Sequence, residues 1–449
     1  MTVRFKIGIA LALVLLLACF YTAFQQVKAA AQAYVYGYPL VLMDLTQHAL
    51  GNGKPINGFT HSREFPDHTF RNVVRPNNDT LYSIAWLDLS AEPVVLSVPD
   101  TQGRYYVMPL MDAWTNVFAS VGKGSDGTQA GDYLIAGPDW QGTIPDGLVP
   151  ITSPTNRVWM IGRIQTNGRD DVPAVAQLQD QFQLTPLQRW GSGKPTQSVI
   201  GSQDKQDAAN NPKQQIKEMN GAEFYARLLR LMVAQPAAPE DVKMLATMAS
   251  VDLVPGESFS PGVVKAWLFD FAKRVTHEGI VKQLANAPVL ENGWSVHRTI
   301  IGNYGDHYGV RTGVAMVGLG ALPPKEAVYP NTKVDGTGQR LTGAHSYKIH
   351  FPAGKAPPAK AFWSVTVYDA EGFLVANPIG RYALGDRDPL IFNPDGSLDL
   401  YIQHAVPQQL ANNWLPSPEG EFALTMRIYL PGDNFLDGSW VLPAVEQTD

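Results

Sequence analysis

The hydrophobic pattern of the chain begins with one uninterrupted apolar run. Residues 7–24 read IGIALALVLLLACFYTAF, eighteen residues without a charge, and they follow Arg4 and Lys6. As a helix this run would be about 27 Å long, just short of the roughly 30 Å hydrocarbon core of a bilayer. Basic residues before an apolar run favour a cytoplasmic N-terminus. We therefore predict a membrane segment over residues 1–27 and a body outside the cytosol.

The only cysteine of the chain, Cys19, stands near the end of this run in the sequence LLAC. This sequence resembles a bacterial lipoprotein box and makes Cys19 a candidate for lipid attachment, although Leu17 occupies a position that usually holds a smaller residue. Cleavage by signal peptidase near residues 28–31 is a second route. Retention as an anchor is the third. The sequence leaves the three open, and all of them export the body.

After the apolar run, periodicity predicts a helix and then a first β domain. Residues 28–58 begin with apolar side chains on all sides, which predicts a buried helix broken at Gly37 and Pro39. Residues 59–175 hold short segments rich in aromatic and β-branched residues, separated by turns, as in β structure. The strands are predicted at residues 81–89, 94–98, 105–111, 117–121, 133–135 and 158–164.

The middle of the chain changes character before strands return. Residues 176–300 contain a polar loop at 191–216, followed by apolar residues that recur at three and four positions. This recurrence is typical of helices. The helices are predicted at residues 222–234, 240–249 and 261–284. Residues 301–449 form the predicted second β domain, with strands at 347–351, 361–368, 374–377, 398–403 and 421–430.

Composition agrees with a β-rich body. Gly and Pro supply 40 and 34 of the 449 residues, which favours many turns. We predict a mainly β fold with a helical insertion. It consists of two jelly-roll-like or β-sandwich units behind an N-terminal membrane segment and helix.

The two β regions share a sequence pattern. LSVP at 96–99 and IHFP at 349–352 are each followed by a strand that ends in Asp-Ala, at Asp112 and Asp369 respectively. The next segments, ending in FAS and VAN, follow at identical spacing. An Asp at a strand end can cap the turn that follows, which is the ordinary role of both residues.

Longer motifs resemble known families. AQAYVYGYPLVLM, RNVVRPNNDTLYS, GRYYVMPLMDAWTNVFASVG and AGPDWQG resemble the bacterial domain of unknown function numbered 1254. FWSVTVYDAEGFLVANPIGRYALGDRD, NPDGSLDLYIQ and NNWLPSPEGEFALTMRIYLPG resemble the domain of unknown function numbered 1214. The resemblance implies two β-rich units with a helical segment between them, and no established reaction. With the apolar run, it predicts a bacterial cell-envelope protein with its body on the periplasmic or extracellular side.

One polar turn is the first candidate for ligand binding. Residues 75–80 read RPNNDT and stand just before a predicted strand that carries Tyr82. An arginine offers a bidentate fork and an amide offers both donor and acceptor, so the turn could fix a carboxylated or polyhydroxylated ligand. The alternative is an Asx turn held by its own backbone bonds. The candidate ligand-binding residues here are Arg75, Asn77, Asn78 and Tyr82.

Further candidates combine aromatic and polar groups, as ligand pockets do. Trp114 and Asn116 follow Asp112, although a core tryptophan is equally consistent with the sequence. Arg381 and Arg387 stand near Asp386 and Asp388, where surface ion pairs are the alternative to an anion site. The other candidate ligand-binding residues are Tyr347, Trp363, Asn377, Arg381 and Trp414.

Charge and motifs narrow the classes of function. A net charge of −6 supplies no basic stripe, so no nucleic acid is expected. GKGSDG at 122–127 has G-x-G-x-x-G spacing but no predicted helix after it, which excludes a dinucleotide fingerprint. No cofactor is predicted. Nine histidines without H-x-x-x-H spacing predict no metal motif and leave only a divalent-metal site assembled through space.

Two functions remain. The first is binding of a polar small molecule or glycan in a cleft formed by the β domains. The second is an envelope hydrolase or lyase with Asp79, Asp112 and Asp369 as catalytic candidates. Perturbed carboxylate pKa values in a shared pocket would favour the enzyme. The membrane, through residues 7–24, and a small-molecule or glycan ligand are the expected partners, and homo-oligomerisation is left open.

Overall fold

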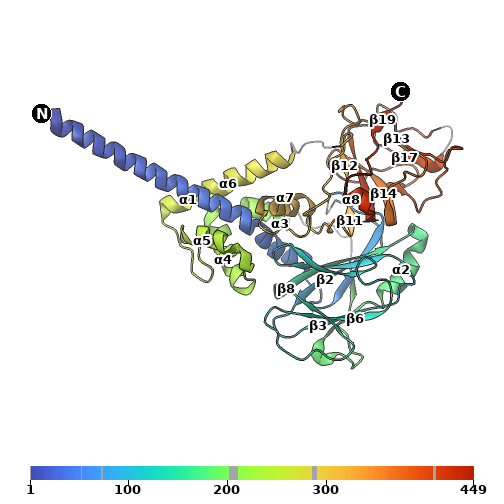
Figure 1. Ribbon diagram of the computed structural model, residues 1–449, viewed down its shortest axis with the longest axis horizontal. Helices are drawn as coiled ribbons and strands as arrows, with labels where there is room; N and C mark the ends of the chain where they lie inside the picture. Colours follow the sequence, from blue (N-terminus) through green and yellow to red (C-terminus); the bar gives the residue numbers. More distant parts are fainter. Residues whose placement is uncertain (1, 52, 72–73, 202–210, 286–290, 408–410) are drawn as a thin grey trace.

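The computed structural model describes residues 2–51, 53–71, 74–201, 211–285, 291–407 and 411–449, with side chains from residue 11 onward. A group of helices surrounds the inner half of one long N-terminal helix, and two β-sandwiches complete the body (Figure 1). In this described part, nineteen strands form four sheets. The predicted β-rich fold with a helical insertion is therefore confirmed.

Ten strands and one helix form the first sandwich. They are β1 (Phe59–His61), β2 (Thr80–Asp88), β3 (Val94–Val98), β4 (Tyr106–Asp112), β5 (Val117–Gly122), β6 (Gly131–Ala136), β7 (Val149–Thr152), β8 (Arg157–Gln165), α2 (Val172–Gln179), β9 (Gln183–Pro186) and β10 (Val199–Ile200). Sheet A1 has the order β10-β1-β2-β8-β4-β5, and sheet B1 has the order β7-β6-β3-β9. Alternate residues of both sheets, such as Leu81, Leu96 and Met108, form one core between them.

The first sandwich extends beyond the predicted boundary at residue 175. Strand β9 pairs with β3, and β10 pairs with β1. The polar segment 191–216 is therefore more than a loop, since it contains β10 and the helix α3 (Pro212–Glu218). Residues 202–210 of that segment lie outside the described residues.

Nine strands form the second sandwich. They are β11 (Ala327–Val328), β12 (Asn331–Thr332), β13 (Tyr347–Phe351), β14 (Ala359–Asp369), β15 (Ala383–Gly385), β16 (Leu398–Gln403), β17 (Trp414–Pro416), β18 (Phe422–Pro431) and β19 (Val445–Gln447). Sheet A2 has the order β11-β18-β14-β15, with β12 also paired to β18, and sheet B2 has the order β17-β16-β13-β19. Trp363, Leu400 and Met426 belong to the core between these two sheets.

The two sandwiches repeat one strand order. Sheets B1 and B2 both combine a parallel outer pair with two antiparallel pairs. The order β8-β4-β5 of sheet A1 recurs as β18-β14-β15 in sheet A2. The similarity that the sequence indicated therefore extends through most of each unit.

One predicted strand, at residues 374–377, is wrong. Extended pairing is absent there because Asn377 holds a turn: its Nδ2 donates to the carbonyls of Val375 and Arg381, at 3.2 and 2.9 Å. The strand equivalent to β5 is instead β15, a few residues later along the chain.

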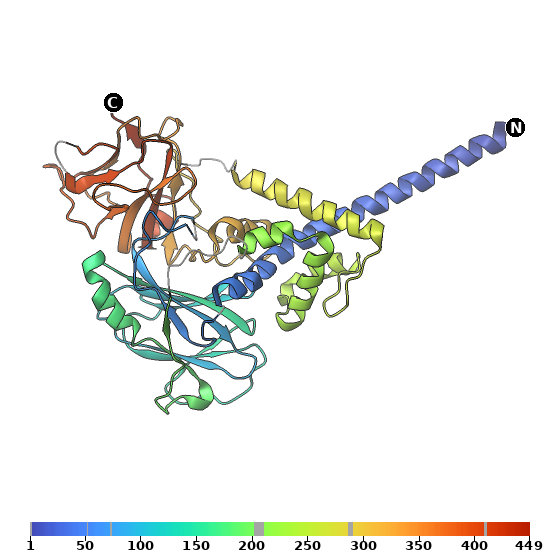
Figure 2. The same cartoon turned by 180° about the vertical axis from the view of Figure 1, so that it is seen from behind.

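The helical part packs around α1 (Thr2–Gly51). Its helices are α3, α4 (Gly221–Ala234), α5 (Val242–Ala249), α6 (Val263–Ala285) and α7 (Tyr308–Gly318). Tyr34, Leu228 and Phe269 belong to their shared core. Helix α7 lies inside the predicted second β domain, residues 301–449, but it packs on α1 with the other helices (Figure 2).

Helix α1 is continuous, so the predicted break at Gly37 and Pro39 is wrong. A proline in a helix leaves the carbonyl four residues earlier without its usual donor. Here the hydroxyl of Thr312 on α7 donates to that carbonyl, of Val35. Gly37 allows close packing, since a Cβ there would lie 2.3 Å from Leu228 Cδ2.

The outer part of α1 projects from the body (Figures 1 and 2). Large apolar side chains from Leu11 to Phe24 are exposed, whereas Ala29 and Ala30 are buried. Within the described residues, this is the one helix whose length and composition would allow it to cross a membrane, a property shared by N-terminal signal sequences. The predicted apolar segment is thus an exposed helix that runs directly into the protein core.

Candidate functional site

The polar turn at residues 75–80 joins the two sandwiches. Asn77 Oδ1 accepts the backbone N–H of Asp79 at 2.6 Å, so the Asx turn exists. The Nδ2 of Asn77 also donates to Tyr429 on β18, at 3.1 Å. Arg75 pairs with Asn331 and donates to Thr425 at 3.0 Å, both in the second sandwich. The same residues therefore form the local Asx turn and contact the second sandwich.

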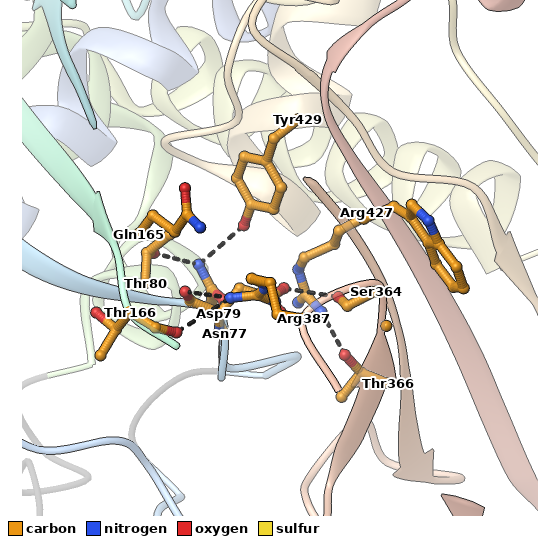
Figure 3. A network of polar contacts seen from close by, with 12 residues as sticks. Asn77, Asp79, Thr80, Gln165, Thr166, Ser364, Thr366, Arg387, Arg427 and Tyr429 are labelled. Carbon is orange, nitrogen blue, oxygen red and sulfur yellow. Dashed lines mark hydrogen bonds and ion pairs between the residues drawn. The ribbon is translucent and has the colours of Figure 1, made fainter. Parts of the chain in front are cut away.

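Asp79 is at the centre of this joint (Figure 3). Its carboxylate is 1% exposed, accepts Ser364 Oγ at 2.7 Å and forms an ion pair with Arg387. Arg387 also donates to the Asp79 carbonyl at 3.0 Å and to the Thr166 carbonyl at 3.1 Å. Its guanidinium carbon lies 4.2 Å from the centre of the Phe362 ring. One buried ion pair thus connects the turn before β2 with the loop after β15.

The predicted surface pairing of Arg387 with Asp386 or Asp388 is wrong. Both carboxylates accept backbone N–H groups instead, Asp386 from Trp363 at 3.1 Å and Asp388 from Gly385 at 2.8 Å. Burial raises the pKa of Asp386 to about 6. Arg387 is drawn toward Asp79 because a buried carboxylate needs a charged partner.

The outer face of sheet A1, opposite its core, carries three cross-strand pairs. Residues of β2 stand opposite residues of β8, and the pairs are Tyr82–Arg163, Ile84–Ile161 and Trp86–Trp159. The two indole rings stack with their centres 5.0 Å apart and their planes 5° from parallel. The indole pair is buried in an apolar cluster with Met43 of α1, and the guanidinium of Arg163 lies four residues further along β8.

Arg163 is buried on this face. It donates to the carbonyls of Ile161 and Gly320 at 3.3 and 2.6 Å, and its guanidinium carbon lies 5.4 Å from the centre of the Tyr82 ring. Among the described residues no carboxylate forms an ion pair with Arg163. Its positive charge is balanced only by dipoles, which makes the face attractive to an anion.

Strand β18, the counterpart of β8 in the second sandwich, also carries a buried arginine on the outer face of its sheet. Arg427 donates to Thr366 Oγ1 at 2.8 Å, to Tyr368 Oη at 2.7 Å and to the carbonyl of Arg75 at 3.1 Å. We call the region between the outer faces of sheets A1 and A2 the inter-sandwich layer. Its arginines are Arg75, Arg163, Arg387 and Arg427.

Several buried polar atoms of this layer have no hydrogen-bond partner among the described residues. They include Tyr105 Oη, Tyr329 Oη, Glu326 Oε2 and Arg387 Nε, and Trp86 Nε1 and Trp159 Nε1 also lack partners in the apolar cluster against α1. The Tyr105 ring contacts Tyr429 and Phe362 of the second sandwich, with centres 5.6 and 5.5 Å apart. Burial, and next the charge of Asp126, raise the pKa of Glu326 to about 7. These atoms include both donors and acceptors.

The other two catalytic candidates lie elsewhere and cap turns. Asp112 Oδ1 accepts the N–H groups of Trp114 and Asn116, at 2.9 and 2.8 Å. Asp369 Oδ1 accepts the N–H of Phe373 at 2.7 Å. Burial raises the pKa of Asp112 to about 6. Asp79, Asp112 and Asp369 share no hydrogen-bond partner among the described residues.

Most remaining candidates are buried in cores or hold loops. Trp114 packs in the helical core and donates to the Pro236 carbonyl at 3.0 Å. Trp414 is buried and donates to the Gln403 carbonyl at 2.9 Å. Arg381 donates to the carbonyls of Ala411 and Trp414. Tyr347 and Trp363 belong to the second sandwich core.

The three remaining predicted site residues are Asn116, Asn78 and Cys19. Asn116 Nδ2 donates to Asp112 Oδ2 at 3.1 Å, within its own turn. Asn78 Nδ2 is buried without a partner in the described part of the chain. Cys19 is exposed on the outer part of α1. The structure thus brings together Arg75, Asn77, Asp79 and Tyr82 and separates the other candidates from them.

A metal site has no support from side-chain clustering. In the described ranges, no group of three or more His, Cys, Asp or Glu residues is placed to hold a metal ion. The chemistry available in the inter-sandwich layer is that of guanidinium, phenol and two carboxyl groups, those of Asp79 and Glu326.

Sequence reasoning missed the arginines inside strands. Arg163 in RVWMIGRIQ and Arg427 in FALTMRIYLP each stand among apolar residues. Arginine is almost never fully buried without a partner. A lone arginine in an apolar strand is therefore a signal that could have found both.

The fold and site define the class as a protein of two related β-sandwiches joined by a polar layer and carried on a long apolar helix. Residues 56–186 match the family described as protein of unknown function DUF1254, and residues 326–433 match the family described as protein of unknown function DUF1214. The chain combines these two regions in the order that its motifs indicated.

Among solved structures, the chain is similar to the crystal structure of the VPA0106 protein from Vibrio parahaemolyticus. The two are 26% identical with a TM-score of 0.72, over 94% of this chain and 100% of that one. An uncharacterised protein from Burkholderia cenocepacia is 11% identical with a TM-score of 0.45, over 96% of each chain. No curated protein gives a significant match.

Proposed function

We propose that this protein binds a small polar ligand with an anionic group, such as a sugar acid, in the inter-sandwich layer. The observation that carries the proposal is the set of buried polar atoms without partners on Tyr105, Tyr329 and Glu326, near the guanidinium of Arg163. Buried polar groups in folded proteins nearly always have partners, and leaving one unsatisfied costs about 1–3 kcal/mol. Ligand oxygen atoms would accept from the hydroxyl groups of Tyr105 and Tyr329, and a carboxylate would face the guanidinium of Arg163.

Aromatic side chains in the layer support a ligand with a ring. The rings of Tyr105, Phe362 and Tyr429 contact one another there, and Tyr105 adds a hydroxyl group without a partner in the described part of the chain. Ligand sites commonly combine such apolar walls with a few directed polar groups. A sugar acid matches this combination, since its ring has apolar faces and its edge carries hydroxyl and carboxylate oxygens.

We propose further that the protein lies in the cell envelope and is held in the membrane by α1. Its body would then lie on the periplasmic or extracellular side. Arg4 and Lys6 before the apolar run support this orientation. The continuity of α1 supports a retained anchor. Cleavage near residues 28–31 would cut the helix where Ala29 and Ala30 are already buried in the core.

The alternative is an envelope hydrolase or lyase that acts on the same ligand class. One observation favours it: a carboxyl group with a pKa of about 7, as burial gives Glu326, suits general acid or base catalysis at neutral pH. Asp112 and Asp369 cap turns elsewhere and do not support this role. Proton transfer would therefore use Glu326 or Asp79, aided by Arg163 and Tyr105.

Thermal unfolding of the full chain in detergent tests the binding proposal. Sugars, sugar acids and phosphoesters are added in turn, and a bound ligand raises the Tm because it stabilises only the folded state. A sugar acid should raise the Tm, and the effect should be reduced in Tyr105→Phe and Tyr329→Phe. Neither variant should be less stable without ligand, since no hydroxyl partner is lost.

Tyr225→Phe is the matched control. The Tyr225 hydroxyl donates to the Ala30 carbonyl at 2.7 Å in the helical core. Its loss should lower stability by about 1 kcal/mol and leave the ligand effect intact. The binding proposal is wrong if no compound raises the Tm, or if the increase persists in both test variants. Turnover of the sugar acid that is lost in Glu326→Gln would favour the enzyme.

A further inference from the structure

The first turns of α6 expose large apolar side chains. Val263, Val264 and Trp267 are 89%, 73% and 65% exposed. The Trp267 ring stacks on Phe271, with ring centres 5.8 Å apart. Adjacent exposed apolar side chains of this size mark a surface that contacts a partner or a membrane.

These turns lie close to the outer end of the buried part of α1. Phe269 contacts the Tyr225 ring at 5.3 Å between centres, and Tyr225 donates to the Ala30 carbonyl. Ala30 lies six residues beyond Phe24, which is about 9 Å along a helix. In both views the start of α6 is beside the part of α1 that leaves the body (Figures 1 and 2).

Little chain separates the membrane segment from the body. The apolar run ends at Phe24, and Ala29 is already buried. Because α1 is continuous there, these few residues rise by about one turn and cannot act as a flexible spacer. A bilayer crossed by α1 would therefore bring its headgroup layer, roughly 5–7 Å deep on each side, against the nearest surface of the helical part.

We propose that the first two turns of α6 rest in the headgroup layer of the membrane that α1 crosses, with Trp267 as an interfacial anchor. Tryptophan is enriched at this depth because its ring is apolar and its N–H is polar. Exposed Lys28 on α1 adds a positive charge near the same level. The inference rests on the proposed retention of α1. The contact would hold the body at a fixed orientation to the membrane.

Single spin labels on the full chain in phosphatidylethanolamine and phosphatidylglycerol vesicles test this contact. Cys19→Ser removes the only cysteine, and Val264→Cys, Leu15→Cys or Val281→Cys then supplies one site. Oxygen enters the bilayer, whereas a nickel chelate stays in water. The label at residue 15 reports whether the apolar part of α1 lies in the bilayer. The label at 281, on the far end of α6, is the matched water-exposed control.

Labels at 15 and 264 should both lose accessibility to nickel relative to the label at 281. Adding Trp267→Ser should restore nickel accessibility at 264 and leave 15 unchanged. Nickel accessibility at 264 equal to that at 281, with 15 protected, would overturn the contact alone. Nickel accessibility at 15 equal to that at 281 would show that α1 does not cross the membrane, and this would overturn the inference as well. Dipolar broadening at 264 that disappears on dilution with unlabelled chain would identify a second copy instead of lipid.

Discussion

At the scale of single residues, Glu326 shows how the fold fixes an unusual carboxyl group. Its side chain is 7% exposed, and one oxygen lacks a partner among the described residues. Gly124 makes room for it, since a Cβ at that position would lie 2.7 Å from both carboxyl oxygens. The motif GKGSDG therefore serves a close approach between the two sandwiches.

We expect Glu326→Gln to stabilise the protein at neutral pH. Burial raises the pKa of Glu326 from 4.5 to about 7, so the folded state holds the proton more tightly than the unfolded state. The stability contributed by this group is complete below pH 4.5 and is lost as the pH rises toward 7. The variant should gain up to about 3 kcal/mol over wild type across this window.

Urea unfolding of both proteins between pH 4.5 and 7.5 measures this difference. Glu257→Gln is the control, because Glu257 is exposed on a loop, and it should follow wild type throughout. A constant difference between Glu326→Gln and wild type over the pH range would contradict the shifted pKa.

At the scale of elements, α1 continues through Pro39 because a neighbouring helix replaces the missing donor. In Thr312→Val, the Val35 carbonyl loses that bond, and we expect a loss of about 1 kcal/mol. In a Pro39→Ala background, the new N–H of residue 39 can donate to Val35. The same threonine substitution should then cost less.

A double-mutant cycle by urea unfolding gives the coupling between the two positions. The control is Thr46→Val, whose hydroxyl donates at 2.7 Å to Leu42, a carbonyl inside the same helix that already has a backbone donor. Its cost should be similar with either residue at position 39. Equal costs of Thr312→Val in both backgrounds would show that the hydroxyl does not compensate for proline.

Element prediction succeeded where short runs of aromatic and β-branched residues stand between turn sequences, and this includes β4 and β18, which are buried on both faces. Strands β3 and β13 match their predicted ranges, and β2, β4, β8 and β18 differ by one residue at each end. The exceptions depended on specific side-chain hydrogen bonds. Asn377 donates to the carbonyl of Arg381, four residues later, and this local turn removed one strand. Thr312, which is distant in sequence from α1, allowed a helix that proline alone would interrupt.

At the scale of the whole molecule, the Asp79–Arg387 pair joins the sandwiches. Removing one partner from a buried ion pair typically costs 3–5 kcal/mol, because the other charge is left unpaired. We expect Asp79→Asn to lower the free energy of unfolding by about this amount. It should also separate the unfolding of the two sandwiches into two calorimetric transitions.

The matched control is the exposed pair of Lys360 and Asp433, whose side chains are 62% and 92% exposed. Lys360→Gln should cost less than about 1 kcal/mol and leave the calorimetric profile unchanged. If Asp79→Asn lowers the free energy of unfolding by no more than Lys360→Gln does, the pair of Asp79 and Arg387 does not hold the sandwiches together.

The candidate site was predicted in part. The motif RPNNDT indicated a polar centre, and the structure places Arg75, Asn77 and Asp79 together with Tyr82. Sequence reasoning missed Arg163 and Arg427, because an outer-face residue of a strand is ordinarily exposed. Here the outer face of sheet A1 is covered by the second sandwich and by Met43 of α1.

The sequence by itself determined the apolar N-terminal helix, the order of strands and helices, and the relation between the two β regions. These follow from local periodicity, which depends on the residues of each segment. The tertiary structure decided the continuity of α1 and the partners of Asp79. It also decided the burial of the arginines in the inter-sandwich layer, because these depend on side chains that are hundreds of residues apart and meet only when the two sandwiches pack.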